Sequence, residues 1–201
     1  MELSSRKNSM SKLKSVTIAM PNMGTVKTFT MTSILDVLAQ TSVPVNFSYP
    51  IHTYIHVARR DCVLEAQKAG SSHIWFVDSD MMWRGNPLEQ LAKHDKHIIG
   101  VHYNERTLPQ TSTVKIEKGK RYVGKLPDHI FQCHAVATGC LLVDMQVFEK
   151  IDKPWFFYEH NDEGEITTGE DMWFCEQAHK AGFGVWCDPS IELRHIGDFA
   201  Y

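Results

Sequence analysis

Apolar residues are arranged along the chain in two patterns, short continuous runs and helical repeats, and these predict two kinds of element. Strands are predicted where about four to eight apolar or β-branched residues stand together, at 16–21, 43–50, 73–80, 97–103 and 183–190. Helices are predicted where apolar positions recur every three or four residues, at 26–42, 55–70, 87–95 and 169–182. The segment 134–151 predicts a strand with a bend at Gly139 and then a short helix. The segment 104–129 is irregular, with an exposed hairpin or loop at 115–125.

Helices that alternate with strands apolar along their whole length are typical of a mostly parallel sheet covered by helices on both faces. We therefore expect an α/β fold class and a single Rossmann-like domain over 16–201, preceded by a flexible N-terminal tail at 1–15. A chain of 201 residues suits one domain with a substantial core. Ligands of such sheets bind beyond the carboxyl ends of the strands.

Composition narrows the class of protein without naming a function. Hydrophobic residues at 43% and charged residues at 22% are ordinary for a soluble globular protein, and a net charge of −3 makes nucleic acid an unlikely partner. The five cysteines include no CxxC pair, which favours reduced thiols. The start of the chain has no apolar secretory core, and no run reaches the ~18–20 apolar residues of a transmembrane segment. We expect a cytoplasmic protein.

The stretch HIWFVDSD places two carboxylates, Asp78 and Asp80, at the end of an apolar run, with Ser79 between them. On an extended backbone, residues two apart leave the same face of the strand. A hard divalent cation such as Mg²⁺ or Mn²⁺ could bridge them while it also holds phosphate oxygens. A polar loop that caps the next helix would explain the same residues.

A second pair of acids, Glu170 and Asp171, opens the predicted helix at 169–182. The helix macrodipole and the free N–H groups of a first turn favour negative charge. Capping alone therefore explains this pair, unless other residues indicate chemistry.

Four stretches, in this order, resemble family 2-type glycosyltransferases of the GT-A fold. They are ARRDCVLEAQKAGSSHIWFVDSDM at 58–81, ATGCLLV at 137–143, GEDMWFCEQAHKAGFGVWCDPS at 169–190 and RHIG at 194–197. A DxD motif, an ED pair at a helix start and a late histidine are together more specific than any one of them. The resemblance implies a metal-dependent glycosyltransferase that transfers a hexose from a UDP-sugar, such as UDP-glucose or UDP-galactose. The acceptor, a glycan, a protein or another hydroxyl compound, stays open.

The same resemblance implies a metal site. Asp80 would be the direct ligand, Asp78 would contact the ribose or the metal, and His195 would complete the set. An imidazole ligand suits Mn²⁺ better than Mg²⁺, so His195 favours manganese. The alternative for His195 is a structural histidine that bonds to the backbone.

For catalysis, the resemblance implies Asp171 as the general base and Glu170 as a group that holds acceptor or sugar hydroxyls. The base role applies only if the reaction inverts the anomeric centre. The donor would be bound by Pro21, Asn22, Met23, Arg59, Asp61, Asp78, Ser79, Asp80, Tyr103, Arg106, Thr138 and Gly139.

Within that set, residues 21–23 would seat the base, and Arg59 would contact the base or the diphosphate. Asp61 stands where many relatives have Asn, which removes an amide donor. Tyr103 and Arg106 would line the sugar or phosphate pocket. Thr138 and Gly139 would let the donor sugar approach the backbone, because glycine lacks the blocking Cβ.

Aromatic residues could add sugar platforms. Trp83 and Trp155, beside predicted loops, are the candidates, while Trp75, Trp173 and Trp186 are expected in the core. Two other functions stay open: a nucleotidyltransferase, disfavoured because no Gly-rich phosphate loop follows the first strand, and a nucleotide-sugar-binding protein without turnover. Little of the chain remains to bind an acceptor, and a partner subunit or homo-oligomer could supply that surface.

Overall fold

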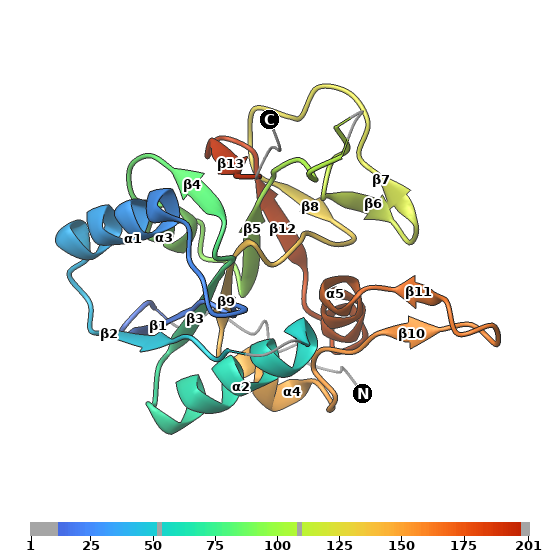
Figure 1. Cartoon of the computed structure of the whole chain (residues 1–201), viewed down its shortest axis with the longest axis horizontal. Coiled ribbons are helices and arrows are strands. Elements are labelled where there is room, and N and C mark those ends of the chain that lie inside the picture. Colours follow the sequence, from blue (N-terminus) through green and yellow to red (C-terminus); the bar gives the residue numbers. More distant parts are fainter. Residues whose placement is uncertain (1–11, 52–53, 108–109, 198–201) are drawn as a thin grey trace, which may run out of the picture.

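The computed structural model describes residues 12–51, 54–107 and 110–197, and these form an α/β fold (Figure 1). The helices are α1 (Thr28–Gln40), α2 (Ile55–Lys68), α3 (Pro87–Ala92), α4 (Gln146–Lys150) and α5 (Glu170–Lys180). The strands of the main sheet are β1 (Val16–Ala19), β2 (Val45–Ser48), β3 (His73–Val77), β5 (Ile98–Val101), β8 (Phe131–Cys133), β9 (Cys140–Asp144) and β12 (Val185–Asp188). The short outer strands are β4 (Met81–Trp83), β6 (Lys115–Glu117), β7 (Lys120–Arg121), β10 (Glu159–His160), β11 (Ile166–Thr168) and β13 (Leu193–His195).

The main sheet has seven strands in the order β2-β1-β3-β9-β5-β12-β8. Strands β2, β1 and β3 are parallel neighbours, as are β5 and β12. Strand β9 lies between β3 and β5 and is antiparallel to both, and β8 is antiparallel to β12 at the edge. The prediction of a mostly parallel central sheet is therefore confirmed, with two antiparallel strands that the apolar pattern did not distinguish.

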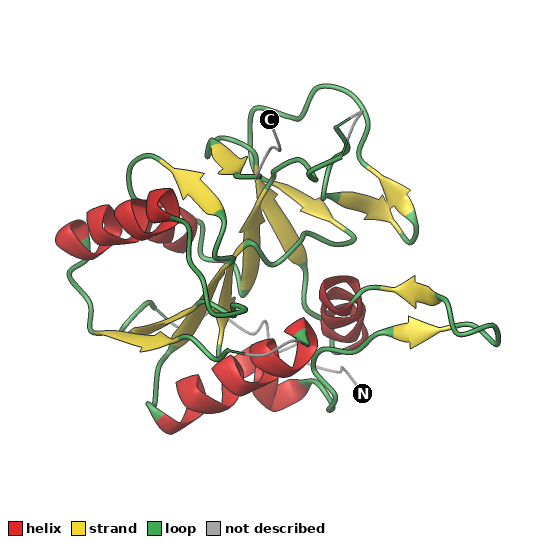
Figure 2. Cartoon of the chain, viewed as in Figure 1, coloured by secondary structure: helices red, strands yellow, loops and turns green. Residues whose placement is uncertain are grey.

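Helices cover both faces of this sheet, as predicted (Figure 2). On one face, α1 and α3 pack through Ile34 and Leu88 in a cluster that includes Trp75 of β3. On the other face, α2, α4 and α5 pack in a second cluster that includes Phe76, the next residue of the same strand. Successive residues of a strand point to opposite faces, so a continuous apolar run is needed where both faces are buried.

The third strand is shorter than predicted. Strand β3 ends at Val77, and residues 78–80 form a turn in which the Met81 amide donates to the Asp78 carbonyl at 3.4 Å. The expectation that Asp78 and Asp80 leave one face of an extended strand is therefore wrong. The turn leads into β4, which pairs antiparallel with β13 so that Met81 stands opposite His195.

The predicted strand with a bend at Gly139 is also shorter, because β9 begins only at Cys140. The Asp78 amide donates to the Gly139 carbonyl at 3.1 Å, which fixes this bend against the end of β3. Both tryptophans predicted as sugar platforms, Trp83 and Trp155, are buried. They lie in the apolar core rather than at a surface.

Candidate functional site

The predicted site residues collect beyond the carboxyl ends of β3 and β5 and at the start of α5. The turn after β3 supplies the DSD aspartates, and the segment after β5 supplies Tyr103 and Arg106. Helix α5 begins at Glu170 itself, so both acids of the ED pair lie in its first turn. Strand β13 brings His195 to the same edge through its pairing with β4.

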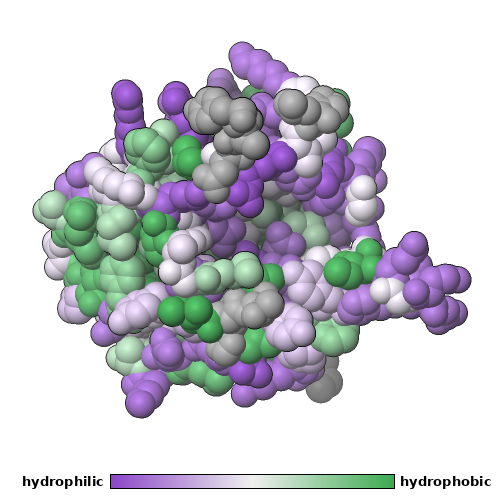
Figure 3. Space-filling model, in the orientation of Figure 1, coloured by the Kyte–Doolittle hydropathy of each residue, from purple (hydrophilic) through white to green (hydrophobic). Residues whose placement is uncertain are grey.

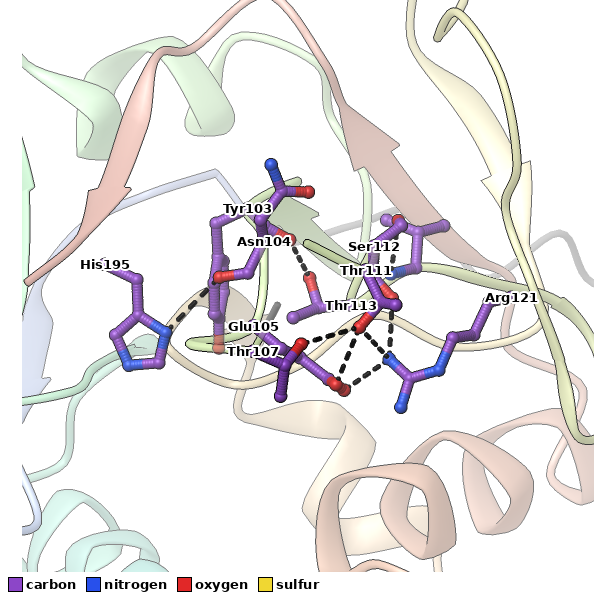
Figure 4. Close-up of polar contacts among 10 residues, drawn as sticks. Tyr103, Asn104, Glu105, Thr107, Thr111, Ser112, Thr113, Arg121 and His195 are labelled. Atoms are coloured by element: carbon purple, nitrogen blue, oxygen red, sulfur yellow. Dashed lines mark hydrogen bonds and ion pairs between the residues drawn. The ribbon is translucent and has the colours of Figure 1, made fainter. Parts of the chain in front are cut away.

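Asp80 and His195 are in direct contact. His195 Nε2 lies 3.3 Å from Oδ2 of Asp80. On the other side of the ring, Nδ1 donates to the Asn104 carbonyl at 3.4 Å (Figure 4). Since a carbonyl only accepts, that bond places a proton on Nδ1. Nε2 then faces a carboxylate, and this is favourable only where a proton or a cation lies between them. The arrangement fits a pair of metal ligands with a fixed tautomer.

Arg106 reaches the same oxygen. Its Nη1 lies 3.1 Å from Oδ2 of Asp80. Burial alone would raise the pKa of Asp80, but the hydrogen bond and charge of His195, together with Arg106, hold the pKa below its ordinary value. Asp80 therefore stays ionised and able to bind a cation.

Asp78 is turned away from Asp80 and faces Arg59. The guanidinium donates from Nη2 to Asp78 at 3.1 Å and from Nη1 to Glu170, so one buried arginine joins the turn after β3 to the start of α5. These carboxylates outweigh the effect of burial and raise the pKa of Arg59 above its ordinary value. Arg60, the next residue, is exposed and pairs with Asp61 at 2.7 Å. Of the two arginines, Arg59 is the one in the site.

Asp171 lies beside this cluster. Its Oδ1 accepts from the Met172 amide at 2.8 Å, and in the part of the chain that the structure describes it forms no ion pair. Burial raises its pKa to about 6, and the Glu170 charge acts in the same direction. A carboxyl group with a pKa near neutrality suits proton transfer.

The wall opposite α5 is formed by Tyr103 and the bend after β8. The Tyr103 hydroxyl accepts from the Gly139 amide at 3.1 Å. Burial, with Asp78 and Asp171 nearby, raises the pKa of Tyr103 well above its ordinary value, so the hydroxyl stays neutral. A Cβ at Gly139 would collide with this hydroxyl and with Met81, so the close approach requires glycine. Thr138 is buried, and its hydroxyl has no partner among the described residues.

The side chain of Asn22 holds the loop that is predicted to seat the base. The Asn22 side-chain amide donates to the carbonyls of Met20 and Tyr49, and its Oδ1 accepts from the Gly24 amide at 2.8 Å. Pro21 is buried, whereas Met23 is 75% exposed. Both N–H groups of this amide are therefore used, while Oδ1 keeps a lone pair that could accept from a base. The Ser79 carbonyl accepts from the start of α1, so Ser79 also has a structural role.

The three predicted metal ligands are only partly brought together. Asp80 and His195 meet, while Asp78 binds Arg59. Across residues 12–51, 54–107 and 110–197, no group of three or more His, Cys, Asp or Glu side chains is placed to hold a metal ion. Two protein ligands still suit Mn²⁺ or Mg²⁺ where waters and phosphate oxygens supply the other positions.

Two features of the site were missed at the level of sequence. Tyr158 lies beside Glu170, and burial next to that carboxylate raises the pKa of its hydroxyl. The second is a polar network in which Arg121 binds Glu105 and the Ser112 carbonyl, and Thr111 donates to Glu105 (Figure 4). It joins β7 to the loop that carries Asn104 and Arg106. The sequence around Tyr158 and around Arg121 has no periodic pattern or motif that could have indicated these contacts.

Comparisons with known proteins support the architecture. No family model matches the chain, and no curated protein matches it. Among solved structures, A197 from STIV aligns with a TM-score of 0.66 and 16% identity over 92% of this chain and 86% of that one. GalNAc-T7, solved with UDP, GalNAc and Mn²⁺, aligns with a TM-score of 0.52 and 13% identity over 95% of this chain.

This chain covers 44% of the GalNAc-T7 chain. A putative glucose-1-phosphate thymidylyltransferase from Bacillus anthracis, solved with sucrose, aligns with a TM-score of 0.50 and 13% identity over 90% of this chain and 89% of that one. The fold is GT-A-like. At these identities the likeness concerns the fold and does not transfer an activity.

In the described residues, no helix combines the length and apolarity needed to cross a bilayer.

Proposed function

We propose that this chain is a metal-dependent glycosyltransferase that uses a nucleotide-sugar donor, with UDP-glucose or UDP-galactose as the first candidates. The observation that carries the proposal is the Asp80–His195 pair at 3.3 Å, formed by residues 115 positions apart at the carboxyl edge of the sheet. Capping of the next helix does not explain this pair, because Asn86 caps α3 while Asp80 contacts His195. The fold likeness to GalNAc-T7 is consistent with the proposal.

Asp80 and His195 would hold Mn²⁺, and Asp78 could join them only through Oδ2, since its Oδ1 accepts from Arg59. When bound, the ion would supply positive charge to the diphosphate leaving group. Arg106, whose side chain is half exposed beside Asp80, is placed to contribute further charge to the same group.

Asp171 would accept the proton of the acceptor hydroxyl at its carboxylate if the reaction inverts the anomeric centre. Glu170 is less suited to that step, because it forms a buried ion pair with Arg59. We therefore assign Glu170 and Arg59 to positioning. The two bonds leave Arg59 further N–H groups, among them a buried Nε that has no partner among the described residues, so its contact with the base or the diphosphate stays a prediction.

The remaining donor contacts stay predictions. Residues 21–23 would seat the base, Tyr103 and Arg106 would line the phosphate or sugar pocket, and Thr138 and Gly139 would lie against the sugar. The orphaned Thr138 hydroxyl is a candidate donor to a sugar oxygen. Asp61, which pairs with Arg60 on the outer face of α2, is the weakest of the predicted contacts.

The test is hydrolysis or transfer of UDP-glucose and UDP-galactose with and without Mn²⁺. We expect activity that depends on Mn²⁺ and falls at least about 100-fold in Asp80→Asn. If the reaction inverts the anomeric centre, Asp171→Asn should cause a loss of the same order. Asp162→Asn, an exposed acid on the loop between β10 and β11, should leave activity unchanged. Absence of Mn²⁺-dependent UDP binding in the wild type would contradict the proposal.

The two alternative functions give different results in the same assays. A nucleotidyltransferase would release pyrophosphate from a nucleoside triphosphate and a sugar phosphate. A binding protein would take up UDP-sugar with Mn²⁺ and turn over none of the donors. In either case the Asp80–His195 pair would still bind the metal.

A further inference from the structure

One region of the chain is almost without charge. Between Ser15 and Ala58, the only Lys, Arg, Asp or Glu residues are Lys27 and Asp36. The chain as a whole is 22% charged, so a segment of this length would ordinarily carry several more. This segment forms β1, α1, β2 and the start of α2. Low charge is expected of buried strands, yet part of this segment lies at the surface.

Large apolar side chains of this segment are exposed. Eight of them have exposed fractions between 38% and 75%. Phe29 and Tyr54 are two of these, and the other six are Met23, Met31, Leu35, Phe47, Tyr49 and Ile51. We call these six residues the α1–β2 face. Apolar side chains gather on the side of the molecule where α1 and β2 lie (Figure 3). The candidate functional site uses only Met23 of this set.

The members of the α1–β2 face are neighbours. Met31, Phe47, Tyr49 and Ile51 line one groove of about 350 Å³. Leu35 follows Met31 by one helical turn, on the same side of α1. Strand β2 is the edge of the main sheet, so nothing in the sheet covers it on that side.

The area of this face suits a stable protein interface. Large side chains bury about 150–250 Å² each, so six at these exposures present on the order of 700 Å². Monomeric proteins rarely expose a contiguous apolar patch above a few hundred Å². A standard interface buries about 800 Å² on each partner. The α1–β2 face therefore approaches what one side of a dimer requires.

We propose that the α1–β2 face binds a second copy of this chain and forms a two-fold symmetric homodimer. The cores of homodimer interfaces are apolar and depleted of charge, as this face is. A membrane surface or a nucleic acid would instead favour Lys and Arg around the contact.

Side chains rather than backbone would carry the contact. Pro44 and Pro50 flank β2, which is only four residues long. Short edge strands bounded by proline resist pairing with another strand. In a two-fold interface each copy would offer the same patch, so a substitution of Leu35 or Tyr49 changes both sides of the contact.

The experiment is sedimentation velocity of the full chain at micromolar concentrations. We expect a dimer for the wild type, and a dissociation constant at least about tenfold higher in Leu35→Lys and in Tyr49→Lys. Val123→Lys changes an apolar side chain that is 90% exposed outside the face, and it should leave the dimer intact. Thermal melts by circular dichroism would show that all variants fold.

Two outcomes would overturn the proposal: a wild type that stays monomeric, and a dimer that both lysine variants retain. If the monomeric wild type also floats with phosphatidylcholine vesicles while the lysine variants do not, the face binds lipid instead. None of these readings depends on transferase activity, so this proposal and the proposed function can fail separately.

Discussion

Arg106 and Asp80 form an ion pair of 3.1 Å at the same carboxylate oxygen that His195 approaches at 3.3 Å. A cation bound to that oxygen must displace Arg106 or share the oxygen with it. The Arg106 side chain is half exposed, and exposed ion pairs contribute only about 0–1 kcal/mol. The arginine therefore acts as a replaceable counter-ion of Asp80.

Arg106→Ala should raise the affinity of the protein for Mn²⁺ alone by about two- to fivefold, because a competitor for Asp80 is removed. The free Mn²⁺ signal in electron paramagnetic resonance measures this binding without any donor. Arg194→Ala is the matched control, since Arg194 is exposed and pairs with Glu192 at 2.7 Å. An Arg106 variant that binds Mn²⁺ no better than the control would refute the counter-ion role.

Arg59 and Arg60 are consecutive, yet their substitutions should differ sharply. Arg59→Met would leave Asp78 and Glu170 without their shared partner, and we expect a loss of about 3–5 kcal/mol in the free energy of unfolding. Arg60→Met removes an exposed pair and should change that quantity by less than about 0.5 kcal/mol. Urea unfolding measures both, and similar losses for the two variants would contradict the assignment of Arg59 to the site.

The sequence was sufficient for the fold class, because continuous apolar strands and amphipathic helices are local signals that tertiary structure rarely reverses. It also predicted that Asp80 and His195 approach each other, although only through the family resemblance. It could not show that residues 78–80 form a turn. Two aspartates after an apolar run fit a strand end and a turn equally well.

Other features depend on contacts between distant segments, which no local pattern records. Strand β9 reads as an ordinary apolar strand, and its antiparallel place between β3 and β5 follows only from the pairing. Arg59 and Arg60 look alike in sequence, and burial alone separates them. The burial of Trp83 and Trp155 cannot be read from the sequence, because a position beside a predicted loop does not decide whether a side chain is exposed.

Asp171 predicts a pH dependence of stability that needs no substrate. Its pKa of about 6 in the folded chain lies above the ~3.9 of an unfolded aspartate. A raised pKa favours the folded state at low pH, and this contribution is lost as pH rises from about 4 to about 6. At pH 8, Asp171→Asn should therefore be more stable than the wild type, by on the order of 1–2 kcal/mol.

The difference in free energy of unfolding between Asp171→Asn and the wild type should approach zero as the pH falls to about 4. Urea midpoints at several pH values measure it, and Asp162→Asn controls for loss of an exposed charge. A gap that widens on acidification would mean that the pKa of Asp171 is lowered in the folded chain.

Gly139 and Tyr103 should behave as one unit in a double-mutant cycle. Gly139→Ala places a Cβ against the Tyr103 hydroxyl, and we expect a loss of about 1–3 kcal/mol from overpacking. Tyr103→Phe removes the acceptor of the Gly139 amide and should also destabilise, by about 1–3 kcal/mol. It removes the clashing oxygen as well, so the double variant should lose at least about 0.5 kcal/mol less than the two single losses together.

Tyr122→Phe provides the comparison for this cycle. Its hydroxyl donates to the Lys125 carbonyl at 3.1 Å in an exposed loop, away from Gly139. When Tyr122→Phe is combined with Gly139→Ala, the losses in free energy of unfolding, measured in urea, should add within about 0.5 kcal/mol. If the Tyr103 pair is equally additive, the close approach of hydroxyl and glycine does not exist in solution. The wall that this contact builds beside Asp78 would then lie farther from the carboxylates, and the site would be wider than described.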